Sequence, residues 1–419
     1  MSSELETLGK QARTAARRLA QRNGEQKNRA LHALAEAIME HEPDILAAND
    51  EDVEGAQKKS QPDRRLARLT LTPQRLERIA KSVLRIARLP DPVGEDLESR
   101  LLPNGLRISK RRIPIGVLGV IYENRPAVTV EMAALCLKSG NAAILHGGPE
   151  THRTNRVFAG IVAAACAEAG LPEHAVQLAS AADRSLLLDM LRGKAFLDLL
   201  IVRGDADLHR LVEEYATVPA IGNDAGVCHI YVDARADPDK VTPILLDAKA
   251  RQPDARNAMD TLLIHQSVAE YLLPPVARAF AQAGIEMRCG PRALGILQGF
   301  GGVTAAKADD FGVEFRSAVA AVKVVSTMEE ALEHIHAHST QHTEAIITED
   351  YRAAMRFVKA IDSSAVLVNA STRFNAGREL GLGIETLIST RRLHARGPLG
   401  LKALTTCKWV ILGDGQVRG

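Results

Sequence analysis

The sequence has few of the features that mark secreted, membrane-spanning or metal-binding proteins. Its five cysteines include no C-x-x-C pair, so we expect reduced thiols rather than a disulfide framework or a metal site. No apolar run approaches the roughly 18 residues that a membrane-spanning helix needs. The polar first residues lack the apolar core of a signal peptide. These absences predict a cytoplasmic protein with no membrane partner and no bound metal.

Net charge and motif content argue against a nucleic-acid-binding protein and against a standard dinucleotide-binding motif. The formal net charge is only +2, which gives no electrostatic footprint for nucleic acid. The G-x-G-x-x-G fingerprint does not occur, so a standard dinucleotide-binding motif is unsupported. What remains is an ordinary globular composition, with 46% hydrophobic residues. A chain of 419 residues is long enough for two or three domains.

The chain is expected to begin with helices, as far as about residue 90. Apolar residues recur with the i, i+3, i+4 period of an amphipathic helix at Leu31, Leu34, Ala35, Ile38 and Met39. Thr72 and Pro73 predict the start of another helix, because threonine can cap a helix and proline suits its first turn.

Beyond residue 113, short apolar runs alternate with helical segments. We expect strands over 113–122, over 142–145, near 176 and over 197–202, and helices over 129–139, over 151–169 and near 186. Such alternation predicts a parallel sheet covered by helices, which binds ligands at the carboxyl ends of its strands. A second block over 228–364 has strands expected over 227–232, 261–265 and 322–325. The apolar tail 408–412 is a strand of the kind that pairs with another subunit or domain.

Two loops of the first block follow strands and precede helices. Gly147 and Gly148 expose backbone amides that can cradle a phosphate, although a plain tight turn explains the pair equally well. The sequence Arg203-Gly204-Asp205 fits a turn with a helix-capping aspartate. That aspartate would repel a phosphate, so the second loop is not an obvious phosphate site.

Histidine and cysteine side chains indicate no site of their own. Cys228 and His229 lie on an expected strand, where packing is the more common role. The histidines at 334, 336, 338 and 342 favour a solvated helix face, because no acidic or cysteine ligand stands at a fixed spacing. The polar stretch 369–375 can bind a ligand or form turns. The residues alone thus indicate a multi-domain α/β protein with a nucleotide or phosphate site.

Longer motifs carry a resemblance to a known family. Residues 113–126 read I-P-I-G-V-L-G-V-I-Y-E-N-R-P, and residues 136–141 read C-L-K-S-G-N. These segments, and further ones at 226–233, 362–365, 369–374 and 393–398, are similar to motifs of gamma-glutamyl phosphate reductase, also called glutamate-5-semialdehyde dehydrogenase. The resemblance extends over nearly the whole chain.

The resemblance implies an aldehyde-dehydrogenase-like fold. A Rossmann-type cofactor domain with N-terminal helices would span 1–226, a catalytic domain would span 227–364, and residues 365–419 would return to the cofactor domain. An oligomerisation strand pair would consist of 101–112 and the C-terminal strand, which implies a homo-oligomer. The implied reaction is NADPH-dependent reduction of L-glutamyl 5-phosphate to L-glutamate 5-semialdehyde in proline biosynthesis, through a cysteine thioester.

Position 256 departs from the family. Residues 247–263 read D-A-K-A-R-Q-P-D-A-R-N-A-M-D-T-L-L, where the family has N-A-K-T-Q-R-P-x-x-C-N-x-x-E-T-L-L. Arg256 therefore stands where the nucleophilic cysteine is expected, and a guanidinium stays protonated and cannot act as a nucleophile. Ala127, His146, Asp205 and the loop 375–378 also differ from the family pattern.

The resemblance implies a set of site residues by motif position. Catalytic positions are Arg256, which we expect to be inactive, with Lys249 and Asn257. Cofactor-binding positions are His146, Gly147, Gly148, Arg203, Gly204 and Glu314. Substrate-binding positions are Arg125, Arg373 and His394. Two functions stay open: the family enzyme acting on its small-molecule substrate, or an inactive paralogue that binds ligands or assists an active reductase or glutamate 5-kinase.

Overall fold

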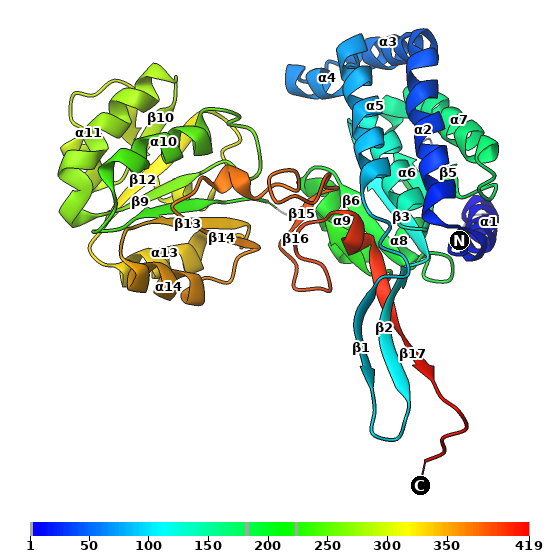
Figure 1. The fold of residues 1–419 in the computed structure, drawn as a ribbon. Helices are drawn as coiled ribbons and strands as arrows, with labels where there is room; N and C mark the ends of the chain where they lie inside the picture. Colours follow the sequence, from blue (N-terminus) through cyan, green and yellow to red (C-terminus); the bar gives the residue numbers. More distant parts are fainter. Residues whose placement is uncertain (1–2, 181–183, 223–224, 419) are drawn as a thin grey trace. The chain divides into compact units, whose positions relative to one another are not determined.

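The computed structural model describes residues 3–180, 184–222 and 225–418. The chain divides into two compact units: unit 1 comprises 1–223, 382–387 and 399–419, and unit 2 comprises 224–381 and 388–398. Each unit contains a parallel sheet, which confirms the expected α/β fold class (Figure 1). No helix in the described ranges is long and apolar enough to cross a membrane.

Unit 1 begins with the expected helices. They are α1 (Ser3–Leu19), α2 (Gly24–Glu40), α3 (Glu42–Lys58), α4 (Asp63–Leu69) and α5 (Pro73–Arg88). The Thr72 side chain accepts a hydrogen bond from the Arg75 N–H (3.2 Å), and Pro73 lies in the first turn of α5, as predicted. In the predicted amphipathic set on α2, only Met39 is exposed, so the helix buries the expected face.

The parallel sheet of unit 1 has the strand order β5-β4-β3-β6-β7. Its strands are β3 (Val117–Tyr122), β4 (Ala142–Gly147), β5 (Val176–Leu178), β6 (Leu199–Arg203) and β7 (Ala220–Gly222). They alternate with α6 (Ala127–Lys138), α7 (His152–Glu168), α8 (Arg184–Arg192) and α9 (Ala206–Tyr215), and the 3-10 helix η1 (Pro149–Thr151) precedes α7. Apolar residues of α1, α8 and α9 pack against β3, β4 and β6 in one core.

The single strand expected over 113–122 is wrong, because the chain bends within it. Residues Arg107–Pro114 form β2 and residues Val117–Tyr122 form β3, in two different sheets. Gly116 has φ +136°, and a Cβ there would lie 2.2 Å from Asp198 Oδ2. Both the backbone angle and this contact favour glycine at the bend.

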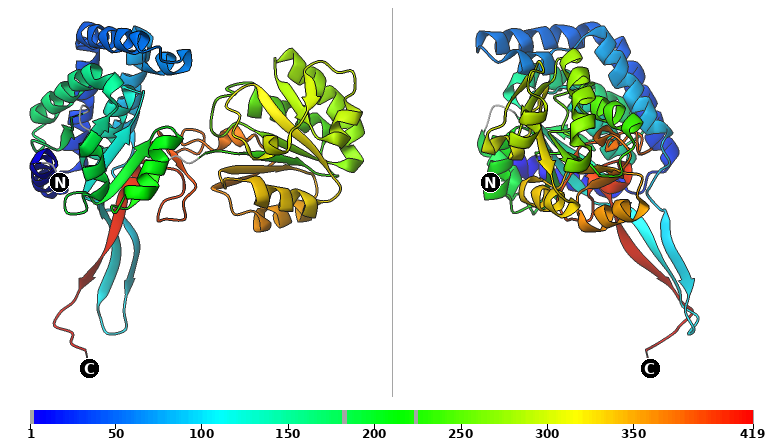
Figure 2. Two further views of the ribbon diagram at one scale, coloured as in Figure 1. Left: turned by 180° about the vertical axis from the view of Figure 1, so that it is seen from behind. Right: turned by 90° about the vertical axis from the view of Figure 1, so that its left-hand side faces the viewer.

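An antiparallel sheet of β1 (Asp96–Leu101), β2 and β17 (Thr405–Leu412) extends from the rest of unit 1 (Figure 2). The expected tail strand thus exists, and its partner is the central strand β2. Large apolar side chains of this sheet are exposed at Leu97, Leu101, Trp409, Ile411 and Leu412.

The parallel sheet of unit 2 has the strand order β11-β10-β12-β9-β8-β13-β14. Its strands are β8 (His229–Val232), β9 (Thr261–His265), β10 (Glu286–Cys289), β11 (Val303–Ala305), β12 (Val319–Val325), β13 (Thr343–Ile347) and β14 (Ala365–Val368). The expected return of the chain to the first domain is at residue 365. In the structure β14 pairs with β13 and stays in unit 2, and the chain returns to unit 1 only at residue 382.

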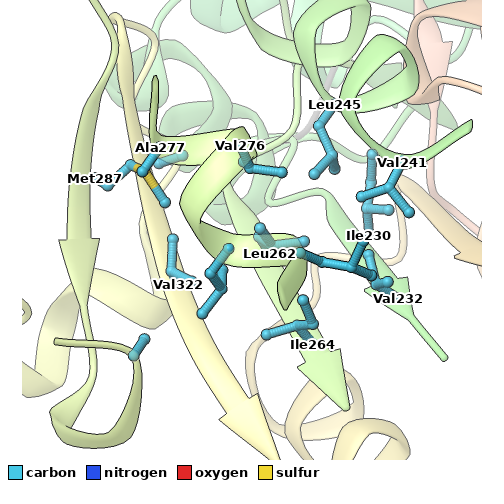
Figure 3. Close-up of a cluster of buried hydrophobic side chains, with 14 of the residues drawn as sticks. Ile230, Val232, Val241, Leu245, Leu262, Ile264, Val276, Ala277, Met287 and Val322 are labelled. Atoms are coloured by element: carbon cyan, nitrogen blue, oxygen red, sulfur yellow. The ribbon is translucent and has the colours of Figure 1, made fainter. Parts of the chain in front are cut away.

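Helices cover both faces of this sheet (Figure 1). Helices α10 (Pro238–Lys249), α11 (Gln266–Gln282) and α12 (Pro291–Ile296) pack against one face of the sheet. On this face the strands contribute the buried side chains of Ile230, Val232, Leu262 and Ile264 (Figure 3). The alternate residues Tyr231 and Leu263 pack on the other face, against α13 (Met328–His338) and α14 (Tyr351–Ala360). This period of two is expected of a strand buried on both sides.

Candidate active site

Residue 256 lies in the loop between α10 and β9, at the edge where the strands of unit 2 begin. The Arg256 side chain is 16% exposed, and its Nη1 lies 3.6 Å from Glu314 Oε2. Arg316, in the left-handed region at φ +50°, places its Nε 3.9 Å from Glu314 Oε1. One carboxylate therefore lies between two guanidinium groups, and the three side chains carry a net positive charge.

Lys249 and Asp260 form a buried ion pair beside this group. Lys249 Nζ lies 3.5 Å from Asp260 Oδ1, and the lysine side chain is fully buried. Asp260 also accepts hydrogen bonds from the N–H groups of Phe315 (3.0 Å) and Cys228 (3.3 Å). Burial raises the pKa of Asp260 to about 7, against the lowering influence of Lys249. The pKa of Lys249 is lowered by burial, although the charge of Asp260 opposes the shift.

Asn257 connects the same loop to residues 373–375. Its Nδ2 donates to the backbone oxygens of Arg373 (3.3 Å) and Asn375 (3.0 Å), so both amide hydrogens are used. The Arg373 guanidinium donates to Asn257 Oδ1 and to Gln252 Oε1 (3.0 Å). The structure therefore brings together the positions 249, 256, 257, 314 and 373 that the resemblance implied.

His394 does not join this group in the described part of unit 2. It is exposed in the segment between β15 (Ile388–Ser389) and β16 (Gly397–Pro398), and no hydrogen bond or ion pair links it to Arg373 or Asn257 among the described residues. The neighbouring Arg392 and Arg396 both pair with Asp362.

A buried thiol and imidazole lie behind the backbone of residue 256. Cys228 Sγ is 3.3 Å from Arg256 O and 3.6 Å from His342 Nδ1. Burial raises the pKa of Cys228 well above its usual value, and burial with the charge of Arg256 lowers the pKa of His342 to about 3. A buried, protonated thiol is a poor nucleophile, which agrees with the packing role predicted for Cys228.

The solvated face predicted for the histidines is wrong for two of them. His334 is 5% exposed and His342 is fully buried. His334 packs edge-on against His229, whose Nδ1 lies 3.0 Å from Glu344 Oε2 in a fully buried pair. No local pattern in the sequence indicates this pairing, because its members stand on separate strands and helices. No metal-binding group of histidine, cysteine and acidic residues occurs among the described residues.

The candidate cofactor residues of unit 1 lie at the carboxyl ends of β4 and β6, both neighbours of β3. A Cβ on Gly147 would lie 2.1 Å from Asn155 Nδ2, and one on Gly148 would lie 2.3 Å from Glu150 Oε1. His146 is buried, and burial lowers its pKa. The glycines at this edge therefore leave room for neighbouring side chains, and one of those is a carboxylate.

The second loop contains two charged groups with different partners. Arg203 Nη1 lies 4.0 Å from Glu131 Oε2. Asp205 precedes α9 as its N-cap residue, but its side chain makes no capping hydrogen bond and pairs instead with Arg65 at 3.0 Å. Asp205 therefore occupies the predicted cap position, but its side chain does not make the predicted capping hydrogen bond. Arg125 is exposed in the loop between β3 and α6.

Comparisons with known proteins place this geometry in a family. The aldehyde dehydrogenase family matches residues 2–290. The chain is 48% identical to gamma-glutamyl phosphate reductase of Roseiflexus castenholzii, over 99% of this chain and 100% of that protein, and 45% identical to that of Escherichia coli O6:H1, with the same coverage. The crystal structure of gamma-glutamyl phosphate reductase from Thermotoga maritima is similar with a TM-score of 0.96 at 40% identity, over 100% of both chains. This chain belongs to the gamma-glutamyl phosphate reductase family, within the aldehyde dehydrogenase family.

Proposed function

We propose that this chain serves the reaction for which its relatives are named, the reduction of L-glutamyl 5-phosphate to L-glutamate 5-semialdehyde in proline biosynthesis. The observation that carries the proposal is full-length identity of 45% to 49% to gamma-glutamyl phosphate reductases. It is supported by the grouping of Lys249, Asn257, Glu314 and Arg373 around residue 256. Identity over the full length favours a shared ligand even where one side chain has changed.

Arg256 stands where the chemical step of this reaction needs a nucleophile. A thioester needs a thiolate at that position, and the nearby thiol of Cys228 is buried. A second candidate is therefore a binding protein without catalysis, which assists an active reductase or glutamate 5-kinase. The observation that favours it is the engagement of Arg256 with Glu314. A guanidinium in that position suits an acyl phosphate or carboxylate ligand.

NADPH is the cofactor that we propose, and it would supply the hydride. The residues of unit 1 fit an anionic nucleotide in part: backbone at Gly147 and Gly148 and the cation of Arg203 lie at one sheet edge. The carboxylate of Glu150 beside Gly148 opposes a phosphate there. In unit 2, Glu314 would hold the nicotinamide ribose, and its partner Arg256 competes for the same carboxylate.

We also propose a homo-oligomer that forms through the sheet of β1, β2 and β17. Its support is the row of exposed apolar residues on this sheet, including Leu101, Trp409 and Ile411, and the unpaired edges of β1 and β17 in the described chain. Exposed edges and apolar side chains are costly in water unless another surface covers them.

The proposed function is tested by phosphate-dependent reduction of NADP+ with glutamate 5-semialdehyde, on the unmodified chain and on Arg256→Cys. NADPH binding is measured in parallel by fluorescence. The matched control is Arg235→Cys, which adds a thiol at an exposed arginine of the same unit. Activity only in Arg256→Cys supports the shared substrate and assigns the defect to one residue. Activity in the unmodified chain refutes the reasoning about Arg256, and NADPH binding with no activity in any variant favours the binding protein.

A further inference from the structure

A second pocket of the chain lies in unit 1, at the edge where the strands of the parallel sheet begin. Its volume is about 830 Å³, and it is lined by α1, by β2 with the bend after it, and by Lys408 of β17. Gly116 and Asp198 also line it, and they directly precede β3 and β6. The candidate cofactor residues Gly147 and Arg203 stand at the carboxyl ends of β4 and β6. Because these strands are parallel, the pocket and the candidate cofactor residues lie at opposite edges of the sheet.

The lining of this pocket is strongly basic. Its charged residues are Arg13, Arg17, Arg111, Arg112, Lys408 and Asp198. Three of the arginines have a carboxylate partner, namely Asp198 for Arg13, Asp96 for Arg111 and Glu95 for Arg112. Five cations and three carboxylates leave a net charge of +2. The pocket therefore favours an anionic ligand.

The carboxylate of Asp198 is engaged within the protein. Its Oδ2 accepts hydrogen bonds from Arg13 Nη1 (2.5 Å) and from the Val117 N–H (2.8 Å). The first bond ties α1 to the sheet, and the second fixes the carboxylate at the start of β3. Asp198 is therefore matched by an internal cation, and the excess positive charge belongs to other residues of the lining.

That excess charge comes from Arg17 and Lys408. Both side chains are exposed, and neither makes an ion pair within the described part of the chain. Arg17 follows Arg13 by four residues on α1, and Lys408 is the direct cross-strand neighbour of Arg111. Like charges at both spacings repel one another. An anion bound between α1 and β17 would offset both repulsions.

The uncharged part of the lining is largely apolar. Ile113, Pro114 and Ile115 contribute from the end of β2 and the bend, and Ala16 and Ala20 contribute from the α1 side. The pocket volume lies in the range of roughly 300–1,000 Å³ that small-molecule sites have, and such sites combine an apolar wall with a few charged groups. A bare inorganic anion would leave this wall uncovered, so the lining suits an anion with an apolar body.

We propose that this pocket binds a nucleoside di- or triphosphate. The phosphate groups lie among Arg17, Arg111 and Lys408, and the nucleoside rests against Ile113 and Ile115. Guanidinium groups donate paired hydrogen bonds to phosphate oxygens, and the lysine adds a point charge. The inference goes beyond the proposed function, because it requires neither the glutamyl ligand nor NADPH to occupy this edge of the sheet.

The test measures binding of ADP to the full chain by isothermal titration calorimetry. Inorganic pyrophosphate and adenosine serve as probes of the two parts of ADP. We expect ADP to bind about tenfold more tightly than pyrophosphate, because only ADP covers the apolar wall, and adenosine to bind more weakly still. Equal affinity for ADP and pyrophosphate would overturn the assignment of a nucleoside.

Single variants then locate the bound ADP. Arg17→Gln and Lys408→Gln should each weaken ADP binding about tenfold, as expected for the loss of one contact to a charged group. Arg18→Gln is the matched control and should leave ADP binding unchanged, because Arg18 is exposed on α1 and does not line the pocket. The three side chains are exposed, so circular dichroism should show unchanged helix content.

Three other results would overturn the inference. The first is the absence of ADP binding, and the second is an equal loss of ADP affinity in Arg17→Gln and Arg18→Gln. The third is ADP that NADPH displaces and that neither Arg17→Gln nor Lys408→Gln weakens, which would place ADP at the carboxyl edge of the sheet. None of these results bears on the proposed reductase function, which the Arg256→Cys assay tests separately.

Discussion

The Lys249→Met substitution tests the buried ion pair behind the candidate active site. The Lys249 Nζ to Asp260 Oδ1 distance of 3.5 Å corresponds to an attraction of about 5 kcal/mol at an effective dielectric constant of about 20. Desolvation offsets much of that attraction in the intact pair, but removal of one partner leaves a buried charge and typically costs about 3–5 kcal/mol. We therefore expect the free energy of unfolding of unit 2 to fall by about 3 kcal/mol at about pH 8.5.

The sign of the pH dependence follows from Asp260. Its folded pKa is raised to about 7, so its contribution to stability is complete below the unfolded pKa and is lost as pH rises through about 7. Without Lys249 that pKa rises further, and the loss continues to higher pH. The effect of Lys249→Met should therefore be roughly half as large at about pH 6, where Asp260 of the unmodified chain is already largely protonated.

Urea unfolding followed by far-ultraviolet circular dichroism at the two pH values measures both quantities. Lys240→Met is the matched control, because Lys240 is a lysine on α10 whose partners Asp237 and Glu349 are substantially exposed. Its effect should stay below about 1 kcal/mol. The double variant Lys249→Met with Asp260→Asn should recover part of the loss. A change below about 1 kcal/mol for Lys249→Met, or the same change at both pH values, would refute the reasoning.

Two further predictions concern the backbone at residue 256 and the exposed sheet. Gly226→Ala should lower the free energy of unfolding in urea by about 1–3 kcal/mol, because the new Cβ would lie 2.2 Å from Arg256 O. Gly295→Ala is the control and should not lower it, because the space around Gly295 is open; equal losses of stability in the two variants would contradict the prediction. Replacing Trp409 and Ile411 by serine and threonine should lower the assembly mass in light scattering at unchanged helix content, and an unchanged mass would place the oligomer interface elsewhere.

Local signals in the sequence were enough for most of the fold. Strand β9 lies at the predicted residues 261–265, and Thr72 caps α5 as expected. These predictions rest on short-range physics, namely buried apolar runs and cap chemistry. The expected strand over 113–122 failed because the bend at Gly116 is fixed by contact with Asp198, which is 82 residues further along the chain. The residue pattern within 113–122 alone cannot predict that contact.

The residues of the candidate site could be predicted from the sequence, but the hydrogen bonds between them could not. Motif position brought Lys249, Asn257, Glu314 and Arg373 to attention, and the structure places them together. It also shows that the Asn257 side-chain amide donates both of its hydrogens to the backbone oxygens of Arg373 and Asn375. Bonds of this kind depend on loops more than a hundred residues apart, so neither periodicity nor residue spacing can reveal them.

The backbone at residue 256 explains how an arginine can occupy this position without loss of the fold. The Arg256 carbonyl faces Gly226 and accepts a hydrogen bond from Cys228, and neither contact depends on the side chain at 256. The guanidinium, in turn, lies 3.6 Å from Glu314, a carboxylate that also lies beside Arg316. A cysteine at 256 would therefore start from the same backbone position and leave Arg316 as the remaining cation beside Glu314, so one substitution changes both the nucleophile and the surroundings of the carboxylate. If Arg256→Cys restores a thiolate but not activity, the remaining defect lies at other positions that depart from the family pattern, such as Asp205 or the loop 375–378.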